Sequence, residues 1–318
     1  MVELGYTLSS EEHGPMELVE YARRAEAIGF DFVSISDHFH PWISAQGESP
    51  FVWSTLGAIA AATDEIDVGV GVTCPTMRIH PVNVAHAVAT VAELFDGRFT
   101  FGVGTGENLN EHVTGHRWPE HDVRLEMLEE AMDVMRELWT GETTSHRGEH
   151  YTVENARLYT VPEETPETIA SAFGPQTARW AAEYGDGLWC SGPKGDVVEA
   201  YRDAGGDGPA YTQLHTCYAE TEDEAIDTVL EYWPNGSLPG ELSQELPTPA
   251  HFEQAAEMVD REDVAESGTT TDPDPQAHVE SVERAIDAGY DHVYVHQIGP
   301  DQESALEFYE EDVLPSVR

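Results

Sequence analysis

The feature that most constrains the fold of this chain is a helix-to-strand signature that recurs along it. The residues from Arg24 to Val33, RAEAIGFDFV, recur from Arg284 to Val293 as RAIDAGYDHV, and a looser copy, AEYGDGLW, covers 182–189. In each copy an amphipathic helix ends at glycine, an Asp follows and a β-like run begins. We expect the glycine to adopt the left-handed conformation that ends a helix. Copies at both ends and in the middle of the chain predict one repeating βα architecture.

Short β-like runs alternate with amphipathic helices along the chain. The expected strands are Val2–Leu8, Phe32–Ser36, Ile66–Thr73, Arg98–Val103, Thr168–Phe173, Gly187–Ser191, Tyr211–Cys217 and His292–Gln297. The expected helices are Pro15–Ile28, Phe51–Ala62, Val82–Phe95, Val123–Trp139, Pro175–Tyr184, Gly195–Ala204, Thr221–Tyr232, Pro275–Ala288 and Gln302–Pro315. About eight βα units in a chain of 318 residues predict an α/β fold of the (α/β)8 TIM-barrel type. A doubly wound open sheet is the alternative.

Two segments do not fit a minimal barrel. Residues 141–162 alternate apolar positions around turn residues, which predicts a β-hairpin insertion. Residues 235–271 are polar and rich in Pro, Gly and Glu, with a possible helix at His251–Met258, and we expect them to form a lid-like insertion near the active face. Because no linker separates these segments from the rest, residues 1–318 are expected to form a single domain.

The charge of the chain excludes several classes of partner. It has 61 Asp and Glu against 15 Lys and Arg, a formal net charge of −46, and Lys194 is its one lysine. Such a surface repels nucleic acid and anionic membranes, so we expect neither as a partner. It also repels itself unless salt screens it, which predicts a cytoplasmic protein of a salt-accumulating organism. The start of the chain lacks a signal-peptide pattern, no apolar stretch is long enough to span a membrane, and the three distant cysteines form no disulfide framework.

Titratable residues cluster where the expected strands end, which is where barrels place their chemistry. Asp37, His38 and Trp42 lie within six residues after one strand, and Glu107 follows another. An imidazole can take a proton near neutral pH, and a nearby carboxylate can fix its tautomer. The structural alternative is that Asp37 caps a turn and that His38 is a hydrogen-bonded core histidine.

Glycines mark a second kind of candidate position. The run GVGTGE at 102–107 is not the GxGxxG dinucleotide motif, and it favours a backbone that closely approaches a flat ligand, with Glu107 aimed at that ligand. The run GVGV at 69–72 on the preceding strand allows the same approach. His112 and His116 are spaced as one helical turn, but a metal needs three or four convergent ligands, so no metal is expected.

Two further segments could bind anions. Lys194 follows a strand and precedes Gly195, where a helix could begin, so its ammonium could hold a substrate anion; the alternative is a surface lysine retained by chance. Residues 174–177, GPQT, open another helix and form a second candidate phosphate site.

Together these motifs resemble the luciferase-like superfamily of flavin- and deazaflavin-dependent oxidoreductases, and within it the coenzyme F420-dependent glucose-6-phosphate dehydrogenase group. The matching stretches are Gly5-Tyr6 with Glu11, SDHFHPW (36–42), CPT (74–76), GVGTGENLNE (102–111), RGEHYTVENARLY (147–159), GDGLWCSGPKG (185–195) and DHVYVHQIG (291–299). The resemblance implies an (α/β)8 barrel, usually a homodimer, with F420 at its C-terminal face and FMN as the alternative cofactor. It implies hydride transfer from a carbinol carbon of a sugar phosphate or other alcohol to C5 of F420.

The resemblance also implies roles for individual residues. His38 would be the general base, Trp42 would lie near the reaction centre, Glu107 would assist proton transfer, and Glu11 is a further active-site position. Cofactor contacts would come from Asp37, Gly71, Val72, Cys74, Gly106 and Asn110, with a non-prolyl cis peptide at Gly71–Val72, while Gly174, Pro175, Gln176 and Thr177 would hold the cofactor tail phosphate. The implied substrate contacts are Lys194, Ser191 and Gln254.

This chain departs from the family at the substrate phosphate. Sugar-phosphate members use several basic residues there; Lys194 matches one, whereas Gln254 stands where another lysine is expected. Because fewer cations are available to hold the phosphate, glucose 6-phosphate is expected to bind weakly. Another sugar phosphate or a neutral alcohol could be the preferred substrate. Two other functions remain open: a different superfamily chemistry, such as methylene-pterin reduction or FMN-dependent monooxygenation, and a non-catalytic cofactor carrier. The presence of His38, Trp42 and Glu107 argues against the carrier.

Overall fold

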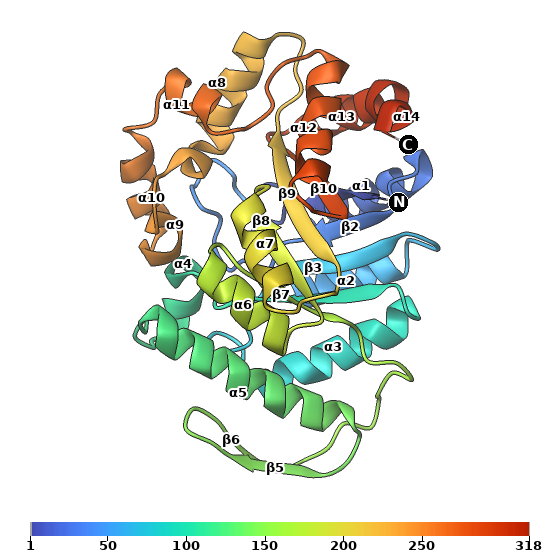
Figure 1. Cartoon of the computed structure of the whole chain (residues 1–318), viewed down its shortest axis with the longest axis vertical. Helices are drawn as coiled ribbons and strands as arrows, with labels where there is room; N and C mark the ends of the chain where they lie inside the picture. Colours follow the sequence, from blue (N-terminus) through green and yellow to red (C-terminus); the bar gives the residue numbers. More distant parts are fainter. Residues whose placement is uncertain (1, 318) are drawn as a thin grey trace.

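The computed structural model describes residues 2–317, and at its centre is a closed barrel of parallel strands (Figure 1). The strands are β1 (Glu3–Leu8), β2 (Phe32–Ile35), β3 (Asp67–Thr73), β4 (Phe99–Val103), β7 (Thr168–Ser171), β8 (Gly187–Ser191), β9 (Ala210–Thr216) and β10 (His292–Gln297). Within these residues their order is β1-β10-β9-β8-β7-β4-β3-β2, and β1 pairs with both β10 and β2. The predicted (α/β)8 barrel is therefore confirmed. The open-sheet alternative is wrong, because each of the described barrel strands has two neighbours.

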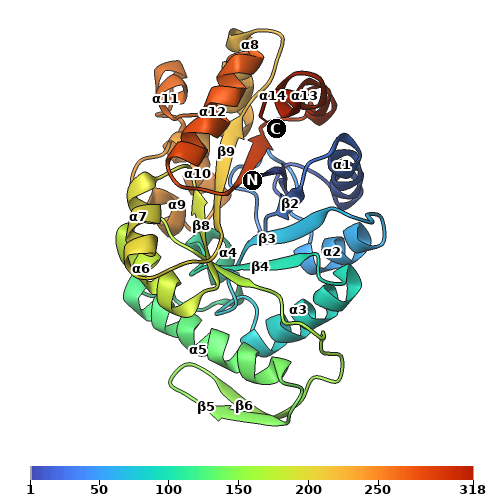
Figure 2. The same ribbon diagram turned by 45° about the vertical axis from the view of Figure 1, so that its right-hand side comes forward.

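Helices surround this barrel, as the turned view in Figure 2 shows. The longer ones are α1 (Pro15–Ile28), α2 (Val52–Ala60), α3 (Pro81–Phe95), α5 (His121–Trp139), α6 (Pro175–Tyr184), α7 (Gly195–Asp203), α8 (Glu222–Tyr232), α12 (Pro275–Asp287) and α13 (Gln302–Phe308). Short turns follow β4 as α4 (Asn108–Glu111) and the 3-10 helix η1 (His112–Thr114). The helix expected over Gln302–Pro315 is divided, because α13 passes into a π-helical turn at Tyr309–Val313 and then into α14 (Leu314–Val317).

In the three copies of the repeated signature, the aspartate has the same role each time, whereas the conformation of the glycine differs. Gly29 and Gly289 adopt the predicted left-handed conformation, with φ of 95° and 103°. The prediction is wrong for Gly185, which is extended with φ of −103°; a Cβ there would lie 2.9 Å from the Ala170 Cβ, so close packing requires this glycine. The Asp of each copy accepts a 2.8 Å hydrogen bond from the backbone N–H of a residue on a neighbouring strand. The pairs are Asp31 with Leu4, Asp186 with Thr168 and Asp291 with Ala210.

Both insertions are present. The predicted hairpin is the antiparallel pair β5 (Thr144–Arg147) and β6 (Thr152–Ala156), which lies outside the barrel beyond α5 in Figures 1 and 2. The lid-like segment contains the 3-10 turn η2 (Pro234–Ser237) and the helices α9 (Leu242–Glu245), α10 (Pro249–Ala256) and α11 (Arg261–Glu266). The helix expected at His251–Met258 is α10, shifted by two residues toward the N-terminus.

The barrel interior is filled by aromatic side chains. Phe32, Ile169, Trp189, Tyr211 and Tyr294 form one buried cluster, in which the Trp189 and Tyr211 rings stack with centroids 4.7 Å apart. Because side chains fill the barrel interior in this way, a ligand must bind at one end of the barrel rather than pass through it. Among residues 2–317, no helix combines the length and the apolar composition that crossing a bilayer requires.

Candidate active site

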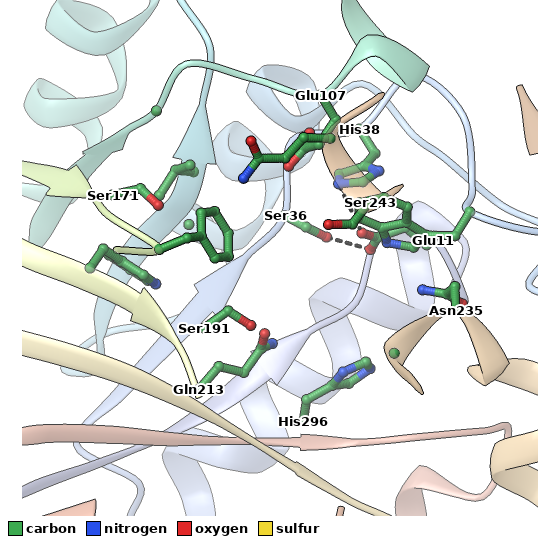
Figure 3. Close-up of a pocket in the computed structure, with 18 of the residues that line it drawn as sticks. Glu11, Ser36, His38, Glu107, Ser171, Ser191, Gln213, Asn235, Ser243 and His296 are labelled. Carbon is green, nitrogen blue, oxygen red and sulfur yellow. Dashed lines mark hydrogen bonds and ion pairs between the residues drawn. The ribbon is translucent and has the colours of Figure 1, made fainter. Parts of the chain in front are cut away.

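A cavity of about 270 Å³ lies where the barrel strands end at their carboxyl termini. Figure 3 shows polar side chains from several strand ends and from the lid-like segment pointing into it. The predicted site residues that line it are Glu11, His38, Trp42, Gly71, Val72, Gly106, Glu107, Thr177 and Ser191. They come from five different strand ends and the first turn of α6, so the fold brings together residues that are far apart in the sequence.

His38 and Glu11 form a buried pair at the cavity wall. The His38 Nε2 lies 3.3 Å from the Glu11 Oε1, and both side chains are almost inaccessible to solvent. The other ring nitrogen, Nδ1, lies 3.2 Å from the backbone carbonyl oxygen of His40. Acceptors therefore face both nitrogens, so a protonated imidazolium can donate on both sides. This arrangement suits a residue that gains a proton during a reaction.

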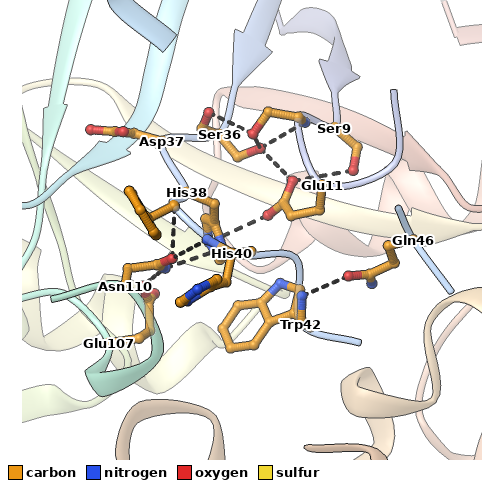
Figure 4. A network of polar contacts seen from close by, with 12 residues as sticks. Ser9, Glu11, Ser36, Asp37, His38, His40, Trp42, Gln46, Glu107 and Asn110 are labelled. Carbon is orange, nitrogen blue, oxygen red and sulfur yellow. Dashed lines mark hydrogen bonds and ion pairs between the residues drawn. The ribbon is translucent and has the colours of Figure 1, made fainter. Parts of the chain in front are cut away.

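Hydroxyl groups hold the Glu11 carboxylate from the opposite side, as Figure 4 shows. The Ser36 hydroxyl donates to Oε2 over 2.6 Å, and the Ser9 hydroxyl donates to the same oxygen over 3.3 Å. Burial alone raises the pKa of Glu11, but His38 and the Ser36 hydrogen bond oppose burial and lower the pKa overall. Glu11 is thus a carboxylate that can stabilise positive charge on His38.

Asn110 connects the loop after β2 to the loop after β4. Its Oδ1 accepts hydrogen bonds from the backbone N–H groups of Phe39 and His40, at 2.9 and 3.2 Å. These bonds fix the amide so that Nδ2 lies 3.1 Å from the His38 Nδ1 and 3.2 Å from the Glu107 Oε2. Asn110 does not itself line the cavity. It orients two residues that do, and its predicted cofactor contact stays a prediction.

Trp42 packs beside His38, with ring centroids 4.9 Å apart. Its other neighbour is Phe252 of α10, at 5.1 Å and nearly perpendicular. The Gln46 side chain accepts from the Trp42 backbone N–H and donates to the carbonyl oxygen of Tyr232. The lid-like segment therefore contributes to the position of the predicted reaction-centre tryptophan.

Along the neighbouring strands β3 and β4, glycine backbone lines part of the cavity. Gly71, Gly104 and Gly106 line the cavity, and the Gly71–Val72 peptide bond is cis, as the resemblance implied. A Cβ at Gly71 would overlap the Trp189 indole, and one at Gly104 would lie 2.9 Å from the Val72 side chain. Gly106 has φ of +78°, which favours glycine. The result is a smooth wall against which a flat ring system can lie.

Cys74 and Asp37 lie behind the cavity and do not line it. The Cys74 sulfur is buried beneath Gly106, where a Cβ on that glycine would lie 2.7 Å away. The Asp37 carboxylate points away from His38; Oδ1 accepts from Arg78 over 2.8 Å and Oδ2 from the Thr73 hydroxyl over 2.8 Å. Asp37 therefore neither caps a turn nor orients His38. The cofactor contacts predicted for these two residues stay predictions.

The Arg78 guanidinium lies between two buried carboxylates. Besides Asp37, it contacts Glu111, whose Oε1 lies 3.5 Å from the Arg78 Nε and whose Oε2 accepts the Arg78 backbone N–H over 2.8 Å. Burial raises the pKa of Glu111 to about 7, although Arg78 opposes the increase. This network supports the loops after β3 and β4 from beneath the cavity.

The predicted anion-binding residues lie at or beyond the rim. Thr177 lines the cavity from the start of α6, whereas Gly174, Pro175 and Gln176 do not. Lys194 is exposed; its Nζ donates to the backbone carbonyl of Phe173 over 3.3 Å. Gln254 lies exposed on α10, away from the cavity lining. The lining contains neither Lys nor Arg, and within residues 2–317 no group of three or more His, Cys, Asp and Glu is arranged to hold a metal ion.

Comparison with known proteins identifies the family. Residues 2–296 match the family described as luciferase-like monooxygenase. The chain belongs to this family. A relative from Rhodococcus jostii (strain RHA1), named F420-dependent glucose-6-phosphate dehydrogenase 2, is 37% identical over an alignment that covers 100% of this chain and 98% of the relative.

Solved structures agree with this assignment to the luciferase-like family. An F420-dependent secondary alcohol dehydrogenase in complex with an F420-acetone adduct has a TM-score of 0.91 and 29% identity, covering 100% of this chain and 99% of that one. The coenzyme F420 dependent tetrahydromethanopterin reductase from Methanopyrus kandleri has a TM-score of 0.79 and 20% identity, covering 100% of this chain and 99% of that one, and it shows the shared fold.

Several residues that line the cavity were not predicted as site residues. Among them are Ser36, Gln213, His215, Trp233, Asn235 and His296. Ser36, Gln213, His215 and His296 lie on or just after barrel strands, so their position near a strand end was a signal available in the sequence. Trp233 and Asn235 belong to an irregular segment, and nothing in their pattern places them over the barrel.

Proposed function

We propose that this protein is a coenzyme F420-dependent oxidoreductase that takes hydride from the carbinol carbon of an alcohol. The observation that carries the proposal is the buried His38–Glu11 pair, which lines the same cavity as three glycines, Gly71, Gly104 and Gly106. The family assignment and the F420-dependent names of two similar proteins support it. A sugar phosphate resembling glucose 6-phosphate, or another alcohol, is the proposed substrate.

The residues present fit a deazaflavin cofactor. Gly71, Gly104 and Gly106 present backbone to the cavity, and a Cβ at any of them would crowd a neighbouring side chain, so these positions are restricted to glycine and leave a wall without side chains. Thr177 and the N-terminal amides of α6 are suited to a phosphate of the cofactor tail. When bound, F420 supplies a ring carbon that accepts a hydride.

The role of His38 follows from its surroundings. With Nδ1–H donating to the His40 carbonyl, the lone pair on Nε2 can accept the proton of a substrate hydroxyl. The imidazolium formed has the Glu11 carboxylate 3.3 Å from Nε2, which stabilises the new charge in a buried site. The Asn110 Nδ2 donates to the Glu107 carboxylate and contacts the His38 ring, which keeps both side chains in place.

The remaining side chains orient the substrate and exclude water. Trp42 covers one side of His38, Leu238 lines the cavity from the lid-like segment, and Trp233 lines it from just before that segment. Glu107 lines the same cavity as His38, where its carboxyl group can hold or release a proton next to a bound ring. These roles of His38, Trp42, Glu107 and Glu11 are the catalytic part of the proposal.

The charge of the cavity bears on the substrate. Its lining has Glu11 and Glu107 but no Lys or Arg, and Lys194 reaches only the carbonyl of Phe173 at the rim. Arg78 is occupied by Asp37 and Glu111. A phosphorylated sugar would therefore rely on Lys194 and Ser191, so glucose 6-phosphate is expected to bind weakly and a neutral alcohol more favourably.

Anaerobic assays of F420 reduction test the proposal. The purified protein in molar KCl is mixed with F420 and with 2-propanol, D-glucose or glucose 6-phosphate, and loss of the F420 absorbance is followed. Reduction with at least one alcohol is expected. If no alcohol reduces F420, and the protein instead binds FMN and consumes oxygen or turns over a methylene-pterin, the proposal is wrong.

We also propose the setting in which the enzyme works. The 61 acidic residues against 15 basic ones support a cytoplasm that accumulates salt. The family resemblance supports a homodimer formed by single-domain chains spanning 1–318. Light scattering in molar KCl tests the homodimer, and a monomeric mass would contradict it.

A further inference from the structure

A second carboxylate–imidazole pair faces the same cavity as His38 and Glu11. His296, at the end of β10, is 1% exposed, and its Nε2 lies 2.7 Å from the Glu12 Oε2. The other carboxylate oxygen of Glu12 accepts the backbone N–H of Gly299 over 2.8 Å. Glu12 does not line the cavity, whereas His296 does. The carboxylate thus lies behind the imidazole and holds it in place.

This geometry determines the hydrogen-bonding state of the ring. A carboxylate oxygen 2.7 Å away accepts the proton on Nε2, as in other carboxylate–imidazole pairs, so a neutral ring carries its lone pair on Nδ1. Within residues 2–317, Nδ1 is buried and has no hydrogen-bond partner. A buried polar atom without a partner is costly, and because His296 lines the cavity, a ligand group that enters there could become the partner of Nδ1.

Besides the Glu12 carboxylate, two aromatic rings lie close to His296. Trp233 presents its edge to the ring with centroids 4.4 Å apart, and His215 lies 5.3 Å away. Burial lowers the pKa of His215 to about 3, so this neighbour is uncharged. Figure 3 shows Gln213 and His296 on the side of the cavity away from Glu107.

We propose that the Nδ1 of His296 is a hydroxyl receptor in a second substrate subsite, which selects a neutral polyol or sugar. This inference rests on the proposed function, since one substrate hydroxyl occupies the His38 end while another donates to His296. Glu12 is a positioning residue that fixes the proton on Nε2. A phosphate dianion has no proton to donate to this lone pair, so the subsite favours a hydroxyl over an anion.

Substitutions at His296 test the subsite in two ways. The first measurement is kcat/KM with F420 for 2-propanol, which has one hydroxyl, and for D-glucose, which has several. His296→Ala is expected to lower kcat/KM for D-glucose about 10- to 100-fold more than it lowers kcat/KM for 2-propanol. His296→Asn, which offers an oxygen near the Nδ1 position, is expected to recover part of the loss. His86→Ala, an exposed histidine of α3, is the matched control.

The second measurement is calorimetric titration of D-glucose into the protein without cofactor. Weaker binding to His296→Ala than to the wild type supports the subsite whether or not turnover is observed. Glu12→Gln should raise KM for D-glucose by a larger factor than it raises KM for 2-propanol. Equal losses with both alcohols, undiminished D-glucose binding by His296→Ala, or a wild type that oxidises 2-propanol but does not bind D-glucose would each overturn the inference. If no alcohol reduces F420, the proposed function fails, and the titration still decides the subsite.

Discussion

Glu11 and Glu12 are consecutive residues, yet their carboxylates contact histidines from different barrel strands. Glu11 lies 3.3 Å from His38 after β2, and Glu12 lies 2.7 Å from His296 on β10. The reason is the barrel order, in which β1 is hydrogen-bonded to β2 on one side and to β10 on the other. The loop after β1 can therefore send one side chain to each neighbour, and a dipeptide positions two of the imidazoles that line the cavity, those of His38 and His296.

Replacing His38 tests the proposal that this residue is the general base. His38→Ala removes the proton acceptor and both of its anchoring contacts, so kcat for alcohol oxidation should fall about 10²- to 10⁴-fold. Binding of F420, followed by its absorbance during titration, should be unchanged, because the glycine wall is intact. His38→Gln is the companion variant if the alanine variant does not fold, and His86→Ala is the control. Turnover close to that of the wild type in both His38 variants would contradict the assignment.

The barrel could be predicted from the sequence because the patterns that indicate its strands and helices are local. The repeated signature, the helical periodicity and the apolar strand at residues 66–73 each depend on neighbours in the chain, and the resulting strand limits differ from the structure by one or two residues in most cases. Even here Gly185 departs from the pattern, because its environment is set by Ala170 on the adjacent strand.

The contacts between side chains in the site were harder to predict from the sequence. Asp37 and His38 are adjacent in sequence, and only the twist of the strand end decides that one contacts Arg78 while the other faces the cavity. Glu12 and His296 are separated by 284 positions, and nothing in the intervening sequence specifies their contact. The family resemblance supplied His38, Trp42 and Glu107, which line the cavity, but it did not supply His296.

The buried Glu111 should make stability depend on pH. Its pKa is raised to about 7, so between pH 4.5 and 7 the unfolded chain releases a proton that the folded chain retains. The free energy of unfolding therefore falls as pH rises through this window, and the loss is complete above it. Glu111→Gln lacks this loss. Between pH 5 and pH 8, the free energy of unfolding of Glu111→Gln should therefore rise by about 2 kcal/mol relative to that of the wild type.

Guanidinium unfolding at the two pH values measures this gain, with KCl held at the same molar concentration. Glu283→Gln, which removes an exposed carboxylate from α12, controls for the change in net charge. A difference between Glu111→Gln and the wild type that is the same at pH 5 and pH 8 would contradict the prediction.

Glu245 should hold the lid-like segment over the cavity. Its Oε1 accepts from the Trp118 indole over 3.1 Å and lies 3.5 Å from Arg124, which is 2% exposed and packs over the Trp118 ring. Its backbone carbonyl accepts from Asn108 over 3.0 Å. Glu245→Ala leaves Arg124 without its carboxylate partner and loosens α9, which carries two cavity-lining residues.

We expect Glu245→Ala to raise KM for alcohols about three- to tenfold, since the side chain is half exposed and the loss corresponds to about 1 kcal/mol. Proteolysis within residues 238–248 should become faster. Glu241→Ala removes an exposed carboxylate from the same segment and should change neither quantity. Equal effects of the two substitutions would show that charge, rather than the contact with Arg124, is responsible.

Stability should depend strongly on salt because the acidic side chains repel one another. The net charge is −46, and the Debye length shortens from about 10 Å at 0.1 M salt to about 3 Å at 1 M. Dialysis from molar KCl to 0.1 M should therefore lower the unfolding temperature and reduce activity, and restoring KCl should reverse the change if the protein has not aggregated. Circular dichroism melting curves across a KCl series measure the effect.

An uncharged osmolyte at the same molarity separates screening from general stabilisation, because it strengthens burial without screening charge. Unchanged melting at 0.1 M KCl would refute the prediction, and full recovery in osmolyte alone would assign the effect to hydration instead of charge.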